Sequence, residues 1–155
     1  AEAAAYATNL DAYSIMQLNP SGVPIERMIR QALSDSGTEP GRVDYINTHG
    51  TGTKLNDAVE AEVLQRIFGT EPRAVVNSTK SLLGHSIGAA GAIEAVVSCL
   101  TLHTGKAHPS LNIEHPIVPF RFPKKAEEGP YRTAISTSYG FAGHNACLVL
   151  RRFEG

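Results

Sequence analysis

The chain has 155 residues, of which 42% are hydrophobic and 19% are charged, and its formal net charge is −1. This length suits a single domain, residues 1–155, with a substantial buried core. A nearly neutral chain gives no electrostatic argument for binding nucleic acid or an anionic membrane, since both need a concentrated basic surface. Its two cysteines, Cys99 and Cys147, are too few for a disulfide framework, so we expect a reducing, cytoplasmic setting.

The longest apolar stretch, residues 87–102, is interrupted by Glu94 and is shorter than the roughly 20 residues that a membrane-spanning helix needs. The N-terminus lacks the basic region of a secretory signal peptide. We therefore expect no association with a membrane. Because the chain begins at Ala1 rather than at Met, we also expect that a preceding segment is missing from it.

In chain order, residues 1–8 are small and apolar and fit either a helix end or a buried strand. A turn at residues 19–22 precedes a predicted helix that begins at Pro24 and ends at Ser36–Gly37. The apolar positions of this helix recur at helical spacing: Ile25, Met28, Ile29, Ala32 and Leu33.

Residues 43–46 predict a short strand, and the glycine-rich segment 49–53 ends it. Asp57 then opens a predicted amphipathic helix that Gly69 ends. Its apolar positions are Ala58, Ala61, Val63, Leu64 and Ile67. Residues 74–77 predict a buried strand.

Residues 78–85 predict a loop, and residues 86–104 predict a long helix whose many small residues favour burial against close neighbours. The proline-rich segment 109–130 is predicted to be irregular or extended. Two β-prone runs, 133–138 and 145–150, are joined by a glycine-rich loop and predict a strand pair.

Strands alternate with helices and the chain closes on a strand pair, which predicts an α/β fold with a mixed sheet. We expect five strands, with helices on both faces. Ligands in such folds bind beyond the carboxyl ends of the strands, so the polar segments that follow the predicted strands are the candidates for chemistry.

Three such segments stand out: residues 47–53, 78–86 and 140–143. His49 follows a strand and precedes glycines, so its imidazole can face a cleft, although a lone histidine there is more often structural. His85 is expected at or near a helix N-terminus, where the helix dipole favours a neutral imidazole that donates a hydrogen bond. Lys80 lies in a small-residue loop, where reaching a buried site and reaching water are equally plausible. The segment 140–143 taken alone favours a tight turn.

The histidines form no HExxH or Cys–His pattern, so no metal site is expected. No glycine-rich segment has the spacing of a phosphate-binding loop.

Taken together and in order, these segments resemble the C-terminal half of β-ketoacyl-acyl-carrier-protein synthases. The resemblance extends over essentially the whole chain and depends on four motifs: His49–Thr53 with Asp57, Thr79–His85, Gly88–Ala92 with Glu94, and Ser138–Asn145. It implies a thiolase-like fold of two similar α/β halves, of which this chain is the second, with residues 1–20 at the junction. Cys99 and Cys147 lie outside any nucleophile motif, so the cysteine nucleophile is expected in the missing N-terminal half.

The resemblance also implies a reaction, a decarboxylating Claisen condensation that uses malonyl-acyl carrier protein (ACP). His49 and His85 stabilise the enolate, Lys80 pairs with Glu94 and helps to orient His85, and Asp57 joins the polar network of the site. Thr51 and Thr53 match positions that hold the pantetheine arm, and Phe141 matches the gating phenylalanine, whose loop contributes to the oxyanion hole. No cofactor is implied, because phosphopantetheine on the carrier protein holds the substrates.

The implied partners are the N-terminal half, acyl carrier protein, and a second complete unit in a homo- or heterodimer. Ala142 departs from the family pattern, which has glycine there, and Thr137 stands where asparagine is common. Alanine has less backbone freedom than glycine, so Ala142 is expected to alter gating. His144, like His103, His108 and His115, is expected to be structural.

Three other functions stay open. A non-catalytic partner resembling a chain-length factor is disfavoured, because His49, His85 and Lys80 are all retained. A decarboxylase-only priming domain depends on the residue at the nucleophile position, which lies outside this chain. A thiolase is disfavoured, since that family has a cysteine in its C-terminal half. A role in fatty-acid synthesis and a role in polyketide synthesis both stay open, and residues 53–57 slightly favour the polyketide synthases.

Overall fold

The computed structural model describes residues 1–155 and has one mixed sheet of five strands, in the order β1-β7-β6-β2-β3. Its strands are β1 (Glu2–Leu10), β2 (Tyr45–Asn47), β3 (Val75–Asn77), β6 (Thr133–Tyr139) and β7 (His144–Arg151). β2 runs parallel to β3 and β6, whereas β7 is antiparallel to both β6 and β1. A separate two-stranded ribbon pairs β4 (Lys106–Ala107) with β5 (Glu127–Glu128). The predicted mixed α/β sheet is confirmed.

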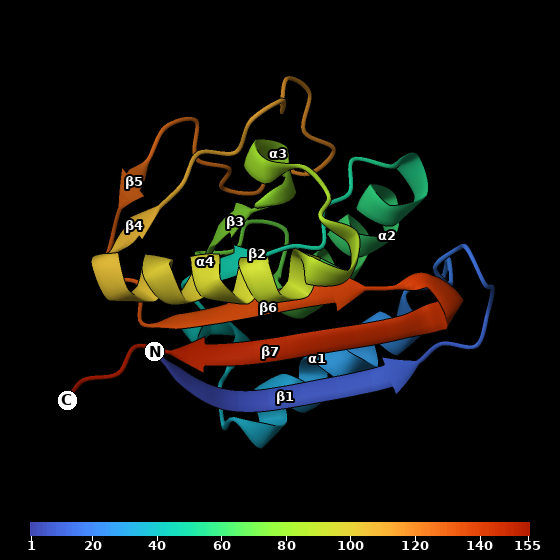
Figure 1. Ribbon diagram of the computed structural model, residues 1–155, viewed down its shortest axis with the longest axis horizontal. Helices are drawn as coiled ribbons and strands as arrows, with labels where there is room; N and C mark the ends of the chain where they lie inside the picture. Colours follow the sequence, from blue (N-terminus) through green and yellow to red (C-terminus); the bar gives the residue numbers. More distant parts are fainter.

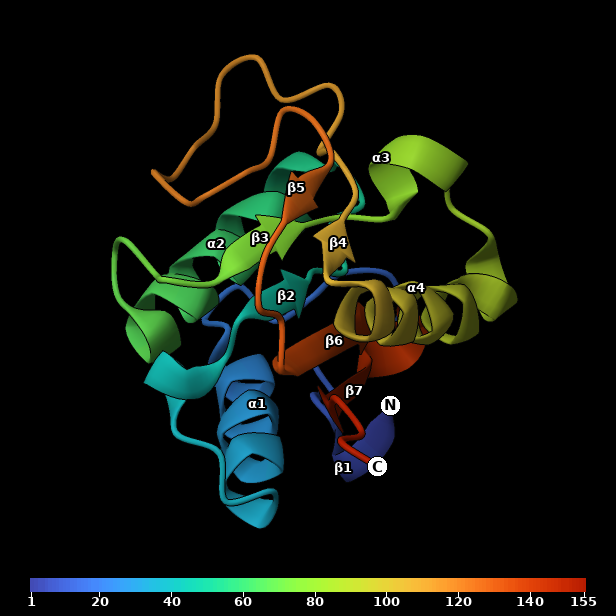
Figure 2. The same ribbon diagram turned by 90° about the vertical axis from the view of Figure 1, so that its left-hand side faces the viewer.

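Helices cover both faces of this sheet, as predicted. Figures 1 and 2 show α4 (Ala90–Thr104) on one face, with α1 (Val23–Asp35) and α2 (Lys54–Phe68) on the other. The short helix α3 (Lys80–Leu83) follows β3. Single 3₁₀ turns occupy Pro40–Arg42, Ile87–Ala89 and Phe141–Gly143.

The alternation of side chains along the strands divides the interior into two hydrophobic clusters. Ile46 and Val76 face the larger cluster beneath α1 and α2, while their neighbours Tyr45 and Val75 face the smaller cluster beneath α4. All five apolar positions predicted for α1 are buried: Ile25, Met28, Ile29, Ala32 and Leu33. Hydrophobic periodicity therefore identified both the helix and the face that it packs.

Three expectations are settled or corrected by tertiary contacts. Residues 2–10 form an edge strand paired with β7, so the N-terminal segment is a strand, but only Ala7 in it is buried. The segment 78–85, predicted as a loop, contains α3. The helix predicted over 86–104 begins as a 3₁₀ turn, and α4 itself begins at Ala90.

The expectation that this last helix is buried against close neighbours holds for one face only. α4 buries one narrow face against the sheet, whereas the side chains of Val96 and Leu100 are 59% and 53% exposed. By length and composition alone, residues 87–104 could also cross a membrane. The same segment packs on β6 and carries Glu94, whose side chain is buried and ion-paired with Lys80, as in the core helix of a folded domain.

The topology brings the polar segments to one edge of the sheet. β2, β3 and β6 are parallel, so their carboxyl ends point the same way. His49 follows β2, Lys80 follows β3, and Phe141 follows β6. The irregular segment after β4 arches over α2 and the end of β3 (Figure 2) and closes one side of this edge.

Candidate active site

His49 lies just beyond the end of β2, with only 8% of its surface exposed. The following residue, Gly50, has a φ of 46°, and a Cβ atom there would lie 2.5 Å from Ser78 Oγ. Only glycine combines this backbone conformation with so close an approach. Gly50 therefore lets the chain turn sharply after His49 and holds the imidazole against the sheet edge.

The backbone around His49 is held by Glu60, a residue that sequence reasoning did not single out. Glu60 Oε1 accepts the His49 N–H at 2.8 Å, and Oε2 accepts the Gly50 N–H at 2.9 Å. Thr137 Oγ1 donates to the same carboxylate at 3.2 Å. Burial raises the pKa of Glu60, and the two backbone N–H groups oppose that shift. The sequence could have indicated Glu60 by its helical spacing, because it falls among the apolar positions on the buried face of α2.

The predicted pairing of Lys80 with Glu94 is present in the structure. Lys80 Nζ donates to Glu94 Oε1, and the two side chains are only 5% and 2% exposed. Burial raises the pKa of Glu94, while the ammonium group of Lys80 counteracts the shift. A buried lysine and a buried carboxylate each need such a partner, which explains a charged residue on the packed face of α4.

Lys80 also contacts His49, although the expected contact was with His85. Lys80 Nζ lies 3.4 Å from His49 Nδ1. An ammonium group only donates hydrogen bonds, so Nδ1 accepts and the ring proton of neutral His49 is on Nε2. Burial, followed by the positive charge of Lys80 and by His85, lowers the pKa of His49 to about 3. His49 is therefore a neutral hydrogen-bond donor across the physiological pH range.

His85 lies in the exposed segment between α3 and the 3₁₀ turn at Ile87–Ala89, five residues before α4. His85 therefore lies near the N-terminal end of the long helical segment, as expected, although the 3₁₀ turn separates it from α4 itself. The Ile87 N–H donates to His85 Nδ1 at 3.1 Å, which leaves the proton of a neutral ring on Nε2. Ile87 adopts a φ of 51°, a costly conformation for a β-branched residue that turns its N–H towards the imidazole.

The two imidazoles lie close together, with ring centroids 5.8 Å apart and ring planes at 87°. Both rings accept at Nδ1 and keep a proton on Nε2. Two neutral N–H donors of this kind can stabilise an oxygen atom on which negative charge develops. No three His, Cys, Asp or Glu side chains lie close enough together to hold a metal ion.

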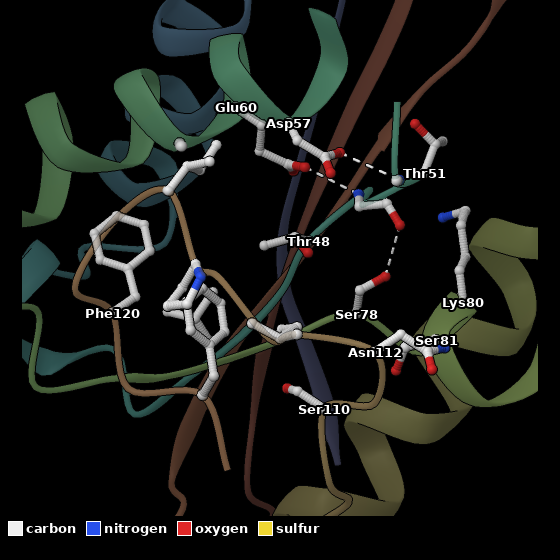
Figure 3. Close-up of a pocket in the computed structure, with 18 of the residues that line it drawn as sticks. Thr48, Thr51, Asp57, Glu60, Ser78, Lys80, Ser81, Ser110, Asn112 and Phe120 are labelled. Carbon is white, nitrogen blue, oxygen red and sulfur yellow. Dashed lines mark hydrogen bonds between the residues drawn. The ribbon is translucent and has the colours of Figure 1, made fainter. Parts of the chain in front are cut away.

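A cavity of about 960 Å³ extends from this site between α2 and the segment 110–122. Lys80 and His85 line one part of it, and apolar side chains such as Leu64 and Phe120 line another. Figure 3 shows Lys80 and Thr51 on one side of the pocket and Phe120 on the opposite side. The cavity therefore joins a polar end at Lys80 and His85 to an apolar end beneath the arching segment, and His49 lies behind Lys80 rather than on the cavity wall.

The predicted pantetheine-binding and supporting residues lie along the polar end of the cavity. Thr51 and Thr53 both line it, with their hydroxyl oxygens 3.0 Å apart. Asp57, in the first turn of α2, accepts the Gly52 N–H at 3.2 Å and the Asn56 side-chain amide at 3.0 Å. Asp57 thus holds the loop that carries both threonines, and its place in a polar network is present as expected.

Phe141 lies apart from the cavity, in the 3₁₀ turn between β6 and β7, and its side chain is 65% exposed. The next residue, Ala142, adopts a φ of 59°, a left-handed conformation that favours glycine. The Ala142 N–H donates to the Ile15 carbonyl at 2.7 Å, which ties the turn to the N-terminal segment. The alanine at this position therefore strains the loop.

Of the two cysteines, Cys147 has the buried character that was expected. Cys147 is fully buried in β7, and burial raises the pKa of its thiol to about 12. Cys99 is half-buried on α4. A cysteine nucleophile needs a lowered thiol pKa, and Cys147 has the opposite.

Comparison with known proteins gives a consistent result. Residues 1–114 match the family model described as "Beta-ketoacyl synthase, C-terminal domain". The chain is 36% identical over 148 residues to the chloroplastic 3-oxoacyl-[acyl-carrier-protein] synthase II of Arabidopsis thaliana, covering 93% of this chain and 27% of that protein. It is 38% identical over 156 residues to 3-oxoacyl-[acyl-carrier-protein] synthase 2 of Coxiella burnetii, covering 98% and 38%.

Solved structures agree with these relatives. The chain superposes on the ishigamide ketosynthase/chain length factor with a TM-score of 0.92 and 36% identity, covering 99% of this chain and 38% of that one. A β-ketoacyl synthase from Burkholderia phymatum gives a TM-score of 0.90 at 26% identity, covering 98% and 37%. The chain therefore spans between about a quarter and two-fifths of the length of the proteins it matches.

Proposed function

Because this chain belongs to the β-ketoacyl synthase family and carries its C-terminal domain with a thiolase-like fold, we propose that it supplies the decarboxylating half of a condensing active site. A preceding half supplies a cysteine that takes the acyl group as a thioester. Malonyl-acyl carrier protein then loses CO₂, and the electron pair of the broken C–C bond forms an enolate. The enolate carbon attacks the acyl thioester and expels the cysteine thiolate.

The observation that carries this proposal is the facing pair of neutral imidazoles, His49 and His85, with ring centroids 5.8 Å apart. Negative charge develops on the thioester oxygen as CO₂ departs. Two Nε2–H donors placed around that oxygen stabilise the transition state more than the ground state. Burial, together with the charge of Lys80 and with His85, keeps His49 neutral, and the contact with Lys80 Nζ leaves its proton on Nε2. Both donors are therefore available before substrate arrives.

The surface supports an assembly with a missing half. Apolar side chains are exposed around the site and on the outer face of α4: Leu83 is 64% exposed, Ile87 72%, Val96 59% and Leu100 53%. Val96 and Leu100 lie one turn apart on α4, so their exposed side chains share one face of the helix, and an exposed apolar face favours protein contact. The chain also covers only 38% of the synthase 2 relative from Coxiella burnetii. We therefore propose an N-terminal half bearing the cysteine and an acyl carrier protein as partners, and a dimer of complete units as the assembly.

A second candidate is a non-catalytic subunit that resembles a chain-length factor, since two structural neighbours are ketosynthases in complex with such a factor. Co-expression with the segment encoded upstream separates the two functions. If this chain is catalytic, the assembly condenses acyl and malonyl thioesters, and each single alanine variant of His49 or His85 removes the activity. If the chain is the non-catalytic partner, its assembly condenses only after a complete ketosynthase is added, and then at an unchanged rate in both variants.

A further inference from the structure

The Thr79 hydroxyl lies buried between the two strand ends that carry the site. Thr79 is 2% exposed and immediately precedes Lys80. Its Oγ1 donates to Asn47 Oδ1 at 2.8 Å, and its backbone N–H points to the same oxygen at 3.4 Å. Asn47 is the last residue of β2, two positions before His49. This side-chain contact joins the segment that holds Lys80 to the segment that holds His49, as the Ser78–Gly50 and Thr48–Asn77 contacts also do.

This contact lies where the sheet no longer holds the two segments together. The parallel pairing of β2 with β3 ends at Asn47 and Asn77, and one further backbone bond joins the Thr48 N–H to the Asn77 carbonyl at 2.8 Å. Beyond this bond the two segments diverge: the segment after β2 leads into α2, and the segment after β3 leads into α3. Side-chain contacts must therefore set the distance between the segment after β2 and the segment after β3. On the cavity side, Ser78 Oγ donates to the Gly50 carbonyl at 2.9 Å. In the interior, Thr79 makes the corresponding contact with Asn47.

The hydroxyl of Thr79 does not have the role that its position in the helix suggests. Thr79 is the N-cap residue of α3, where a threonine side chain normally accepts a backbone N–H from the first turn. Here it makes no such bond and turns to Asn47 instead. The hydroxyl thus makes a tertiary hydrogen bond in place of a helix cap, which indicates that the contact with Asn47 stabilises the structure.

A third group completes the arrangement around Thr79. His108 Nε2 lies 3.3 Å from Thr79 Oγ1, and the His108 backbone carbonyl accepts the Asn77 side-chain amide at 2.6 Å. His108 Nδ1 lies 2.8 Å from the Pro109 carbonyl, which only accepts, so the proton of a neutral His108 is on Nδ1 and Nε2 is an acceptor. The Thr79 hydroxyl therefore has two acceptors within reach, and its proton goes to the nearer one, Asn47 Oδ1.

We propose that Thr79 is a positioning residue that fixes the separation of Lys80 from His49 through its hydrogen bond to Asn47. Lys80 Nζ reaches His49 Nδ1 at 3.4 Å, the outer limit of a hydrogen bond, so a small relative shift of the two segments breaks the contact. With the contact, the His49 proton stays on Nε2. Without it, both tautomers are populated, and the donor required at the substrate is present only part of the time.

The tautomer of His49 tests this directly in the 155-residue chain, without any activity. Thr79→Val removes the hydroxyl and keeps the shape, whereas Thr79→Ser keeps the hydroxyl. Ring ¹⁵N spectra at neutral pH are expected to show only the Nε2–H form of His49 in the wild type and Thr79→Ser, and a mixture in Thr79→Val. His85 is an internal reference, because its Nδ1 accepts from the Ile87 backbone, and its spectrum is expected to stay unchanged.

A single Nε2–H tautomer of His49 in Thr79→Val overturns the proposal. A mixture that also arises in Thr79→Ser or at His85 overturns it too, because it reveals a general loss of structure. If Thr79→Val does not fold, Thr79→Ala gives the same test without placing a methyl group against the Asn47 oxygen.

The effect on catalysis rests on the proposed function. In the assembled enzyme, Thr79→Val is expected to lower kcat about tenfold or more with little change in KM, and Thr79→Ser to restore it. An inactive wild-type assembly would refute the proposed function and leave the tautomer result standing.

Discussion

Lys80 Nζ lies 3.4 Å from His49 Nδ1 while the same ammonium group is ion-paired with Glu94. This relationship makes Lys80 the centre of the site. Its charge is balanced by a carboxylate on α4, and its remaining protons fix the state of the imidazole after β2. Burial, the charge of Lys80 and the nearby His85 together keep His49 neutral.

Removing one partner of the buried pair should destabilise the fold more than removing both. Lys80→Met or Glu94→Leu alone leaves an unpaired buried charge and is expected to cost about 3–5 kcal/mol of unfolding free energy. The double variant should recover most of this loss, because two apolar side chains of similar size then fill the space. Urea unfolding of the four proteins measures the coupling. Additive losses in the double variant would mean that the two charges do not depend on each other.

His49 should make the protein less stable in acid. Its pKa falls from 6.5 to about 3 on folding, so the unfolded chain binds a proton more readily. This contribution is constant above pH 6.5 and is lost progressively as the pH falls from 6.5 towards 3, by an amount on the order of 4 kcal/mol. His49→Gln should therefore flatten the dependence of unfolding free energy on pH within this range. Parallel curves for the two proteins between pH 7 and pH 4 would contradict the buried, neutral state.

Gly50 and Gly52 form a matched pair for the loop that follows His49. Both have positive φ angles, 46° and 75°, but only Gly50 lies against neighbouring atoms, with Ser78 Oγ 2.5 Å from the position of an added Cβ. Gly52→Ala should cost about 1 kcal/mol from backbone strain alone. Gly50→Ala should cost about 1–3 kcal/mol more because it also forces the loop away from Ser78. Thermal unfolding of both variants measures the two losses of stability. Equal losses would show that the close approach of Gly50 to Ser78 is unimportant.

Ala142→Gly should stabilise the protein, against the usual effect of adding glycine. Ala142 has a φ of 59°, where an alanine is strained by roughly 1–2 kcal/mol and glycine is not. After the greater entropy of glycine in the unfolded chain is subtracted, a net gain of about 0.5–1 kcal/mol is expected. The control is Ala146→Gly in the extended strand β7, which should destabilise by about the same amount. A loss of stability in both variants would rule out strain at Ala142.

Much of the fold could be predicted because its signals are local. The helical spacing of Ile25, Met28 and Ile29 identified α1 and its buried face, and the tight loop between two β-prone runs identified the β6–β7 pair. The N-terminal strand could not be assigned, since residues 2–10 carry no periodicity of their own and form a strand only through pairing with β7. α3 was missed for a similar reason, because four residues are too few to show a helical repeat.

The candidate site was predictable in its membership but not in its contacts. The pairing of Lys80 with Glu94 followed from the need of a buried carboxylate for a cation. That Lys80 meets His49 rather than His85 depends on how β2 and β3 align, which no local pattern encodes. Glu60 escaped notice because a glutamate on a helix is ordinarily solvent-exposed, and only the path of the His49–Gly50 backbone gives its carboxylate partners.

Release of CO₂ from malonyl-acyl carrier protein by the assembled synthase tests the proposed role of this chain most directly. His49→Ala and His85→Ala are each expected to lower the rate by about 10²–10³-fold, since each removes one donor to the developing oxyanion. Acylation of the cysteine in the partner half should continue in both variants, which shows that the assembly is intact. Decarboxylation at the wild-type rate in both variants would contradict the assignment of the two imidazoles.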